Sequence, residues 1–244
     1  MKAIIVSDLH IGSPYFLHEE FKRLLENIPH DFELILNGDI IDDPYSKLSA
    51  SHQRTVDLIE QLSHRQKVVW IRGNHDNGCF RAGFGKVHLK HIHVLEQRLM
   101  ITHGDDFDRI MPKSRVFMKA FTLMHNLRIK LGAKPVHVAQ YAKKWYFLYR
   151  ILCKSVMTNA VSFAMKNGCE AVACGHTHYA EDTVFEGIRY INTGAWTESP
   201  AFYLSVTDDE IALKRIIDSV ELRAARTFKL ADSRAYFPAA NSRP

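Results

Sequence analysis

The stretch VVWIRGNHD at residues 68–76 decides the fold of this chain. Its first four residues are apolar and favour β structure, which predicts a strand buried on both faces. The strand runs directly into Gly73-Asn74-His75-Asp76, a polar loop that on its own would be an ordinary turn. The same succession of apolar strand and polar loop occurs four more times, at Asp8-Leu9-His10, Gly38-Asp39, His103-Gly104-Asp105 and Gly175-His176-Thr177-His178. We therefore expect the five loops to form one shared site.

Amphipathic helices alternate with the first strands. After a strand at residues 2–6, apolar side chains recur at helical spacing from residue 17 to residue 28. They do so again from residue 55 to residue 62, after a strand at 33–36. This alternation predicts an α/β sheet with a site at the carboxyl ends of its strands. Further strands are predicted at 91–95, 99–102 and 170–174, and hairpins at 184–191 and 202–216.

The composition predicts a folded cytoplasmic protein with reduced thiols. With 244 residues, 46% of them hydrophobic, the chain is long enough for one large α/β domain plus an insertion, which excludes a disordered chain. Its cysteines show no C-x-x-C spacing, which argues against a structural zinc site and a disulfide framework. These cysteines are Cys79, Cys153, Cys169 and Cys174. We expect no export signal or membrane span, because no apolar run approaches the roughly 20 residues that a span requires.

The basic charge is concentrated in one segment. Between Arg109 and Cys169 there are twelve lysines and arginines and no Asp or Glu, whereas the rest of the chain carries 20 basic and 27 acidic residues. We therefore predict that residues 108–166, which we call the insertion, form a helical unit that interrupts a domain spanning residues 1–217. Residues 218–244 would form a C-terminal tail.

Apolar and aromatic side chains accompany this basic charge. They recur at helical spacing from Val116 to Leu131 and form a run from Trp145 to Leu152. Basic helices with such faces suit an anionic lipid surface or an amphiphilic substrate. Two alternatives stay open: an apolar stripe that only packs on the core, and a basic surface that follows a nucleic-acid backbone.

The five loops supply the donors of a metal site. Carboxylate, amide and imidazole donors without cysteine suit Mn²⁺, Fe²⁺ or Zn²⁺. Each donor alone could be a helix cap or a turn residue, but their joint occurrence at strand ends favours a common role. The set exceeds what one ion accepts and suits two ions that share a carboxylate. The donors are Asp8, His10, Asp39, Asn74, His103, His176 and His178. The remaining nearby acids, interpreted as solvated residues at the rim, are Asp42, Asp43, Asp106 and Asp108.

The five blocks resemble the signature of the calcineurin-like metallophosphoesterases, in order and spacing, over residues 4–193. This resemblance implies an α/β fold in the form of a four-layer αββα sandwich, with the insertion as a helical lid. It also implies two divalent ions that share Asp39. The other ligands would be Asp8, His10 and His178 for one ion, and Asn74, His103 and His176 for the other.

Two further residues of the third block receive catalytic roles from this resemblance. His75 is not a metal ligand in the family, so it would stabilise the charged transition state or protonate the leaving oxygen. Asp76 would orient His75.

Within the family, the helical insertion resembles the lid of the UDP-2,3-diacylglucosamine pyrophosphatases of lipid A synthesis. That resemblance implies hydrolysis of UDP-2,3-diacylglucosamine to UMP and 2,3-diacylglucosamine 1-phosphate by a hydroxide that bridges two manganese ions, with iron, zinc or magnesium as alternatives. It also implies a lipid-linked nucleotide sugar as partner and peripheral association with the inner face of the inner membrane. His75 departs from this branch, whose best-known members carry Arg there, so simpler phosphomonoester or phosphodiester substrates stay open.

Two other functions stay open. A metal-dependent nuclease or cyclic-nucleotide phosphodiesterase would use the basic segment to bind phosphate groups. A non-catalytic scaffold of the same fold would bind a partner protein, although such scaffolds usually lose metal residues that this chain retains.

Overall fold

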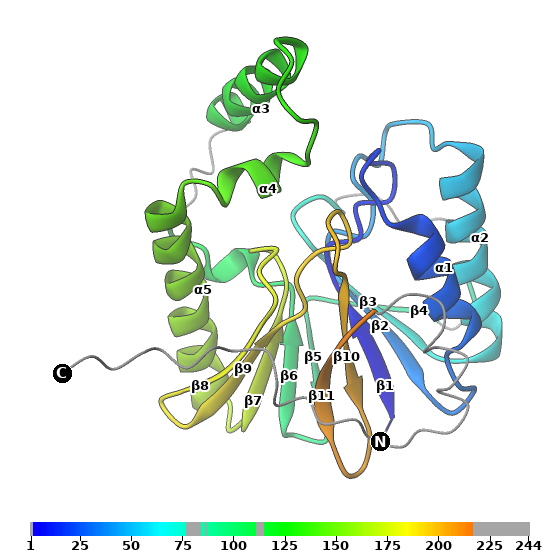
Figure 1. Cartoon of the computed structure of the whole chain (residues 1–244). Coiled ribbons are helices and arrows are strands. Elements are labelled where there is room, and N and C mark those ends of the chain that lie inside the picture. Colours follow the sequence, from blue (N-terminus) through cyan, green and yellow to red (C-terminus); the bar gives the residue numbers. More distant parts are fainter. Residues whose placement is uncertain (1, 77–83, 86, 111–114, 217–244) are drawn as a thin grey trace.

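Two β-sheets packed face to face form the centre of the computed structural model (Figure 1). The structure describes residues 2–76, 84–85, 87–110 and 115–216. Helices cover the outer face of each sheet, which confirms the predicted α/β class and the four-layer αββα arrangement. The predicted tail at 218–244 and Cys79 lie outside the described residues.

The first sheet has six strands in the order β11-β10-β1-β2-β3-β4. Its strands are β1 (Ala3–Val6), β2 (Glu33–Asn37), β3 (Val68–Ile71), β4 (Val87–Lys90), β10 (Phe202–Val206) and β11 (Ile211–Arg215). Strands β1 to β4 run parallel, β10 pairs with β1 in antiparallel orientation, and β11 pairs with β10 in antiparallel orientation. Within β1, Ile4 packs toward the helices and Ile5 toward the second sheet, because consecutive residues of a strand point to opposite faces. Burial on both faces explains the continuous apolar runs.

The second sheet has five strands in the order β5-β6-β7-β9-β8. They are β5 (Ile92–Leu95), β6 (Leu99–Thr102), β7 (Ala171–Cys174), β8 (Glu181–Phe185) and β9 (Ile188–Asn192). Strands β6, β7 and β9 run parallel, with β5 and β8 as antiparallel edges. Ile101 and Ile191 of this sheet share a core cluster with Ile35 of the first sheet. The two predicted hairpins, β8 with β9 and β10 with β11, are confirmed.

Three helices cover the outer faces of the sheets. Helices α1 (His18–Glu26) and α2 (Ala50–Arg65) bury Phe21 and Ile59 in the core beside Leu34 of β2. Helix α2 begins after Ser49, whose Oγ accepts a hydrogen bond from the N–H of His52 (3.3 Å), as an N-cap should. Helix α5 (Tyr146–Lys166) covers the second sheet.

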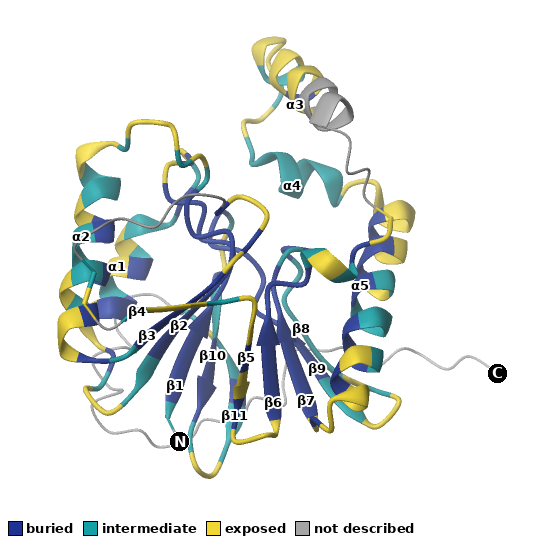
Figure 2. Cartoon of the chain, turned by 180° about the vertical axis from the view of Figure 1, so that it is seen from behind, coloured by how far each residue is buried: buried dark blue, intermediate teal, exposed yellow. Residues whose placement is uncertain are grey.

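The insertion divides into a part that joins the core and a part that stands away from it. The buried face of α5 packs on the second sheet, so the alternative of an apolar stripe that packs on the core holds for this helix. Helices α3 (Arg115–Lys130) and α4 (Val138–Ala142) lie beyond the edge of the sheets (Figure 1). The side chains described in α3 are mostly exposed (Figure 2). The boundaries of the insertion and of the interrupted domain stay a prediction.

The helices of the described residues are too short or too polar for a membrane span. None of them is long and apolar enough to cross a bilayer.

Candidate metal centre

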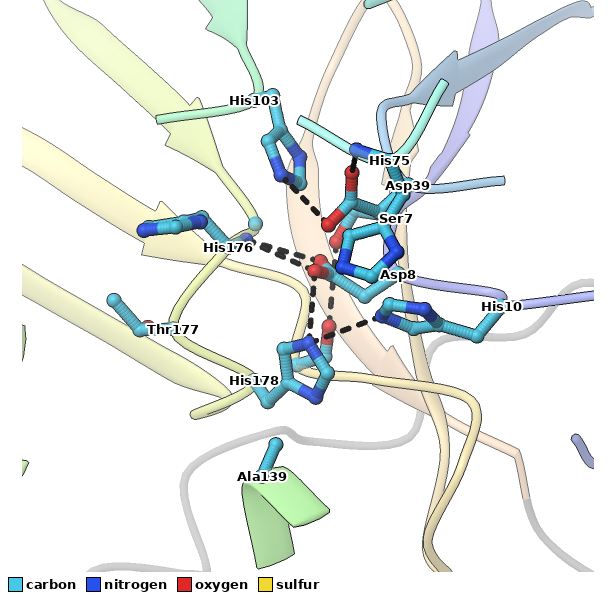
Figure 3. A network of polar contacts seen from close by, with 12 residues as sticks. Ser7, Asp8, His10, Asp39, His75, His103, Ala139, His176, Thr177 and His178 are labelled. Atoms are coloured by element: carbon cyan, nitrogen blue, oxygen red, sulfur yellow. Dashed lines mark hydrogen bonds and ion pairs between the residues drawn. The ribbon is translucent and has the colours of Figure 1, made fainter. Parts of the chain in front are cut away.

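The five polar loops converge at one edge of the two sheets. Strands β1, β2 and β3 end there in the first sheet, and β6 and β7 end there in the second (Figure 1). Backbone hydrogen bonds join the loops: the N–H of Asp8 donates to Gly38 O (3.0 Å), and the N–H of Gly175 donates to His103 O (2.8 Å). Side chains from all five loops therefore surround one position, and Figure 3 shows most of these side chains.

The backbone is left-handed at five of the predicted metal ligands. Their φ angles are positive: Asp8 (52°), His10 (50°), Asp39 (53°), His176 (63°) and His178 (56°). For residues with a Cβ this conformation is uncommon and costs on the order of 1–3 kcal/mol each. Such strain persists only where surrounding contacts impose it, and it concentrates at functional sites.

Two glycines make room for the carboxylates of the site. A Cβ on Gly73 would lie 2.2 Å from Asp39 Oδ1, and a Cβ on Gly175 would lie 2.3 Å from Asp8 Oδ2. Both distances are far below van der Waals contact, so a larger residue at either position would displace the carboxylate. The close approach of a carboxylate thus explains why these loops contain glycine.

The first group of candidate ligands consists of Asp8, His10 and His178, all of them buried. His178 Nε2 lies 3.2 Å from Asp8 Oδ1 and 3.2 Å from His10 Nε2 (Figure 3). Two imidazole nitrogens and a carboxylate oxygen thus face a common position.

The second group consists of Asp8, Asp39 and His103, which are also buried. His103 Nδ1–H donates to Asn37 O (3.0 Å), and the opposite nitrogen, Nε2, lies 3.3 Å from Asp39 Oδ2. That Nε2 atom is buried and makes no hydrogen bond among the described residues. Its contact with Asp39 is an ion pair without hydrogen-bond geometry, and a cation between Nε2 and the carboxylate would satisfy both atoms.

The last two predicted ligands form a third contact beside these groups. His176 Nδ1 lies 3.1 Å from Asn74 Oδ1. The backbone N–H of His176 lies 3.1 Å from each oxygen of Asp8, which links this contact to the first group. The structure thus brings all seven predicted ligands to one place.

Electrostatics at the site favour cations. Burial raises the pKa of Asp39, but the neighbouring imidazoles, His103 foremost, outweigh it and hold that pKa well below its usual value. Burial lowers the pKa of His103, but the Asp39 carboxylate outweighs burial and holds that pKa well above its usual value. In Asp8 the same balance between burial and the imidazole of His178 lowers the pKa. Among the described residues, only histidines form ion pairs with these two carboxylates.

These residues fit divalent ions. The carboxylates are buried and ionised, His103 Nε2 lacks a hydrogen bond, and the donors are those that divalent ions accept in proteins. The two compact groups share Asp8, whereas the sequence assigned the shared position to Asp39. The bridging role of Asp39 stays a prediction. The set of donors does not select one metal.

His75 and Asp76 are neighbours in the sequence but occupy different environments. His75 is exposed, and its Nδ1–H donates to Asp42 O (2.8 Å). Asp76 is buried, and its oxygens accept hydrogen bonds from the N–H groups of Ile40 (2.9 Å) and Gly73 (3.1 Å). Asp76 therefore ties two loops together, and its role in orienting His75 stays a prediction.

Two acids that the sequence placed at a solvated rim belong to the site. Asp42 Oδ1 lies 2.9 Å from His10 Nδ1, and Asp108 Oδ2 lies 2.9 Å from His176 Nε2. Asp108 is buried, and Asp42 is about one-third exposed. The solvated interpretation is therefore wrong for both residues, whereas Asp43 and Asp106 are exposed as expected. No sequence pattern distinguished the two pairs.

The insertion reaches the site through two residues that the sequence did not single out. The ring of His137 stacks on His178, with centroids 5.6 Å apart and planes inclined by 16°. Burial, followed by the neighbouring imidazoles, lowers the pKa of His137 to about 3. Lys143 Nζ donates to His178 O (2.6 Å) and forms a close ion pair with Glu198. Residues 137–143 therefore border the candidate ligands, as the position of Ala139 in Figure 3 also shows.

The chain is similar to a known protein family in its sequence and to several solved structures. Residues 1–180 match the family model for calcineurin-like phosphoesterases. Similar solved structures include Yfce, a phosphoesterase from E. coli, with 18% identity, coverage of 89% of this chain and 100% of that chain, and a TM-score of 0.45. A novel archaeal phosphodiesterase is similar at 15% identity, covering 88% and 99% with a TM-score of 0.46. Vacuolar protein sorting 29 from Cryptosporidium parvum is similar at 12% identity, covering 88% and 95% with a TM-score of 0.45. No curated protein matches the chain.

Proposed function

The chain belongs to the calcineurin-like phosphoesterase family, and from this membership and the geometry of the site we propose that it is a metal-dependent hydrolase of phosphoric esters or diphosphates. The observation that carries the proposal is the pair of buried ligand groups that share Asp8. Two divalent ions held by the seven donors would supply Lewis-acid activation of the phosphoryl group and of the attacking water. Manganese is the ion that we propose first.

In this proposal His75 contacts the substrate. Its ring is exposed beside the site, with its centroid 4.9 Å from that of His10. Because Nδ1–H is engaged with Asp42 O, Nε2 is the nitrogen left for a substrate. A protonated Nε2 would donate to a phosphoryl oxygen or to the leaving oxygen, and Nδ1 would keep the ring in place.

For the substrate, we propose UDP-2,3-diacylglucosamine, cleaved to UMP and 2,3-diacylglucosamine 1-phosphate. The support is the insertion, which after Asp108 combines a basic sequence without Asp or Glu with exposed apolar side chains and which borders the site through His137 and Lys143. The exposed apolar residues are Leu123, Met124, Leu127, Leu131, Trp145, Tyr146, Phe147 and Leu148. Side chains of this kind suit acyl chains, and lysines and arginines suit a diphosphate.

The same surface supports peripheral attachment to an anionic membrane on the cytoplasmic side. Exposed Trp145, Tyr146 and Phe147 beside Lys144 would insert between headgroups while basic residues contact anionic lipids. Sedimentation with vesicles that contain phosphatidylglycerol should exceed sedimentation with purely zwitterionic vesicles. Equal sedimentation with both would count against attachment.

The proposed reaction is tested by incubating the purified protein with Mn²⁺ and UDP-2,3-diacylglucosamine and measuring UMP by mass spectrometry. We expect Mn²⁺-dependent release of UMP, its loss in Asp39→Asn, and its retention in Asp43→Asn, a change at an exposed acid four residues away. Hydrolysis of bis(p-nitrophenyl) phosphate, single-stranded DNA or a cyclic nucleotide without UMP release would favour the phosphodiesterase or nuclease alternative. Failure to hydrolyse any of them would favour a scaffold.

A further inference from the structure

Two histidines of the candidate metal centre are held by a carboxylate on one ring nitrogen while the other nitrogen faces a second predicted ligand. In His10, Nδ1 lies 2.9 Å from Asp42 Oδ1, and Nε2 lies 3.2 Å from His178 Nε2. In His176 the nitrogens are exchanged: Nε2 lies 2.9 Å from Asp108 Oδ2, and Nδ1 lies 3.1 Å from Asn74 Oδ1.

These contacts fix which nitrogen of each ring is free to bind a metal. A carboxylate accepts a hydrogen bond, so the nitrogen beside it carries the proton and the opposite nitrogen of a neutral ring has the lone pair. The lone pair would therefore be on Nε2 in His10 and on Nδ1 in His176. Each of these atoms faces other predicted ligands.

The two residues that carry these carboxylates are themselves held in place by further hydrogen bonds. Asp108 is buried, and its second oxygen, Oδ1, accepts a hydrogen bond from the N–H of Ile110 (2.8 Å). Asp42 follows the Asp39 loop, its N–H donates to Ile11 O (3.0 Å), and its own O accepts from His75 Nδ1 (2.8 Å). The Asp108 carboxylate therefore has a partner besides His176, and in Asp42 the backbone that carries the carboxylate is fixed on both sides.

We infer that Asp42 and Asp108 are positioning residues of the metal centre, each of which orients one histidine, raises the basicity of its free nitrogen and thereby strengthens the binding of one ion. Partners of this kind are worth about 10- to 100-fold in metal affinity.

Asp42 also lies near His75, and the three groups His10, Asp42 and His75 fall within 4.8 Å of one another. We assign Asp42 to positioning rather than to a third ion because its Oδ1 already engages His10 Nδ1. The inference rests on the proposed function, because it requires that the centre binds metal.

The test measures Mn²⁺ binding without turnover. Free Mn²⁺ is followed by electron paramagnetic resonance as the ion is titrated into metal-free protein, which gives the number of bound ions and the affinity of each. The variants are Asp42→Asn, Asp42→Ala, Asp108→Asn and Asp108→Ala. The controls are Asp43→Asn and Asp106→Asn, which change exposed acids one and two residues away.

We expect two bound ions in the wild type, and in each alanine variant a loss of about 10- to 100-fold in affinity for one ion with the other nearly unchanged. The asparagine variants should lie between wild type and alanine, because the amide oxygen still accepts a hydrogen bond but carries no charge. The controls should bind as the wild type does. A general loss of folded structure would instead lower the affinity for both ions equally.

Three results would overturn the inference. One is unchanged affinity in all four variants while the wild type binds two ions, which would leave the proposed function intact. Another is an equal loss of affinity for both ions in the two Asp42 variants or in the two Asp108 variants. The third is a wild type that binds no Mn²⁺, which would overturn the proposed function as well. Because Asp42 is partly exposed, its variants should fold even if those of buried Asp108 do not.

Discussion

The loops at the edge of the sheets and the outer part of the insertion differ in how their side chains are held. In the loops, Asp8, Asp39 and His103 are buried, and the strained backbone is fixed by hydrogen bonds between loops. In the insertion, Leu131 and Phe147 are more than 70% exposed. The rigid loops suit chemistry that requires fixed geometry, and the exposed side chains suit a partner that covers them. Our proposal therefore assigns the reaction to the loops and the choice of substrate to the insertion.

The largest effect is expected from Asp8→Asn, because Asp8 belongs to both ligand groups. Loss of metal activation is worth several kcal/mol, so kcat should fall by about 1,000-fold or more for every substrate. Steady-state kinetics with bis(p-nitrophenyl) phosphate and with UDP-2,3-diacylglucosamine would measure this. A variant that loses only one of the two activities would contradict the division between loops and insertion.

The next largest effect concerns stability, which should distinguish the core between the sheets from the outer part of the insertion. Ile35 is fully buried between the sheets, so Ile35→Ala should lower the free energy of unfolding by about 2–5 kcal/mol. Leu131 is 80% exposed, and Leu131→Ala should change it by no more than about 0.5 kcal/mol. Urea denaturation measures both. Equal losses would show that the outer insertion is packed in solution.

A smaller and more selective effect is expected from Phe147→Ser. Phe147 is 74% exposed in the insertion, so its loss should reduce kcat/KM for UDP-2,3-diacylglucosamine by about 10-fold through lost apolar contact with the acyl chains. Hydrolysis of bis(p-nitrophenyl) phosphate should not change. The matched control is Val184→Ser, at a similarly exposed apolar residue of β8, which should affect neither substrate. Loss of both activities in Phe147→Ser would argue against a role confined to substrate binding.

The smallest effect concerns the pH dependence of stability, away from the site. Burial first, and then Lys90 and Lys67, lower the pKa of His93 to about 4. Between pH 6.5 and 4 the unfolded chain therefore binds a proton that the folded chain does not, so stability falls as the pH falls through this range. His93→Asn should reduce this fall in thermal denaturation measured at each pH, and His91→Asn, at an exposed neighbour, should not. The opposite order of the two variants would contradict the assignment.

The strand ends were predictable from the sequence, and so was the convergence of the five loops, because apolar runs and polar loops are local patterns. The left-handed backbone at residues such as Asp8 was not, since Asp and His adopt positive φ more often than most residues but still only in a small minority of cases. Asp42 and Asp43 are adjacent acids in the sequence, and only their positions in space distinguish the one beside His10.

In the insertion, too, the sequence does not show which apolar side chains are buried. Tyr149 is buried and Phe147 is exposed, although both belong to one apolar run at the start of α5. The run predicts a helix with apolar residues, but the face that packs on the second sheet depends on where the helix lies. Strand β4 and helix α4 were not predicted, because neither contains a buried residue and neither shows the continuous apolar run of the buried strands.

Diffraction from crystals of the protein soaked in Mn²⁺, recorded at the manganese absorption edge, tests the central claim most directly. We predict two anomalous peaks about 3.5–4 Å apart, one in contact with Asp8, His10 and His178 and the other with Asp39, Asn74 and His103. Peaks only at other positions, or no peak within bonding distance of Asp8, would contradict a metal-dependent hydrolase.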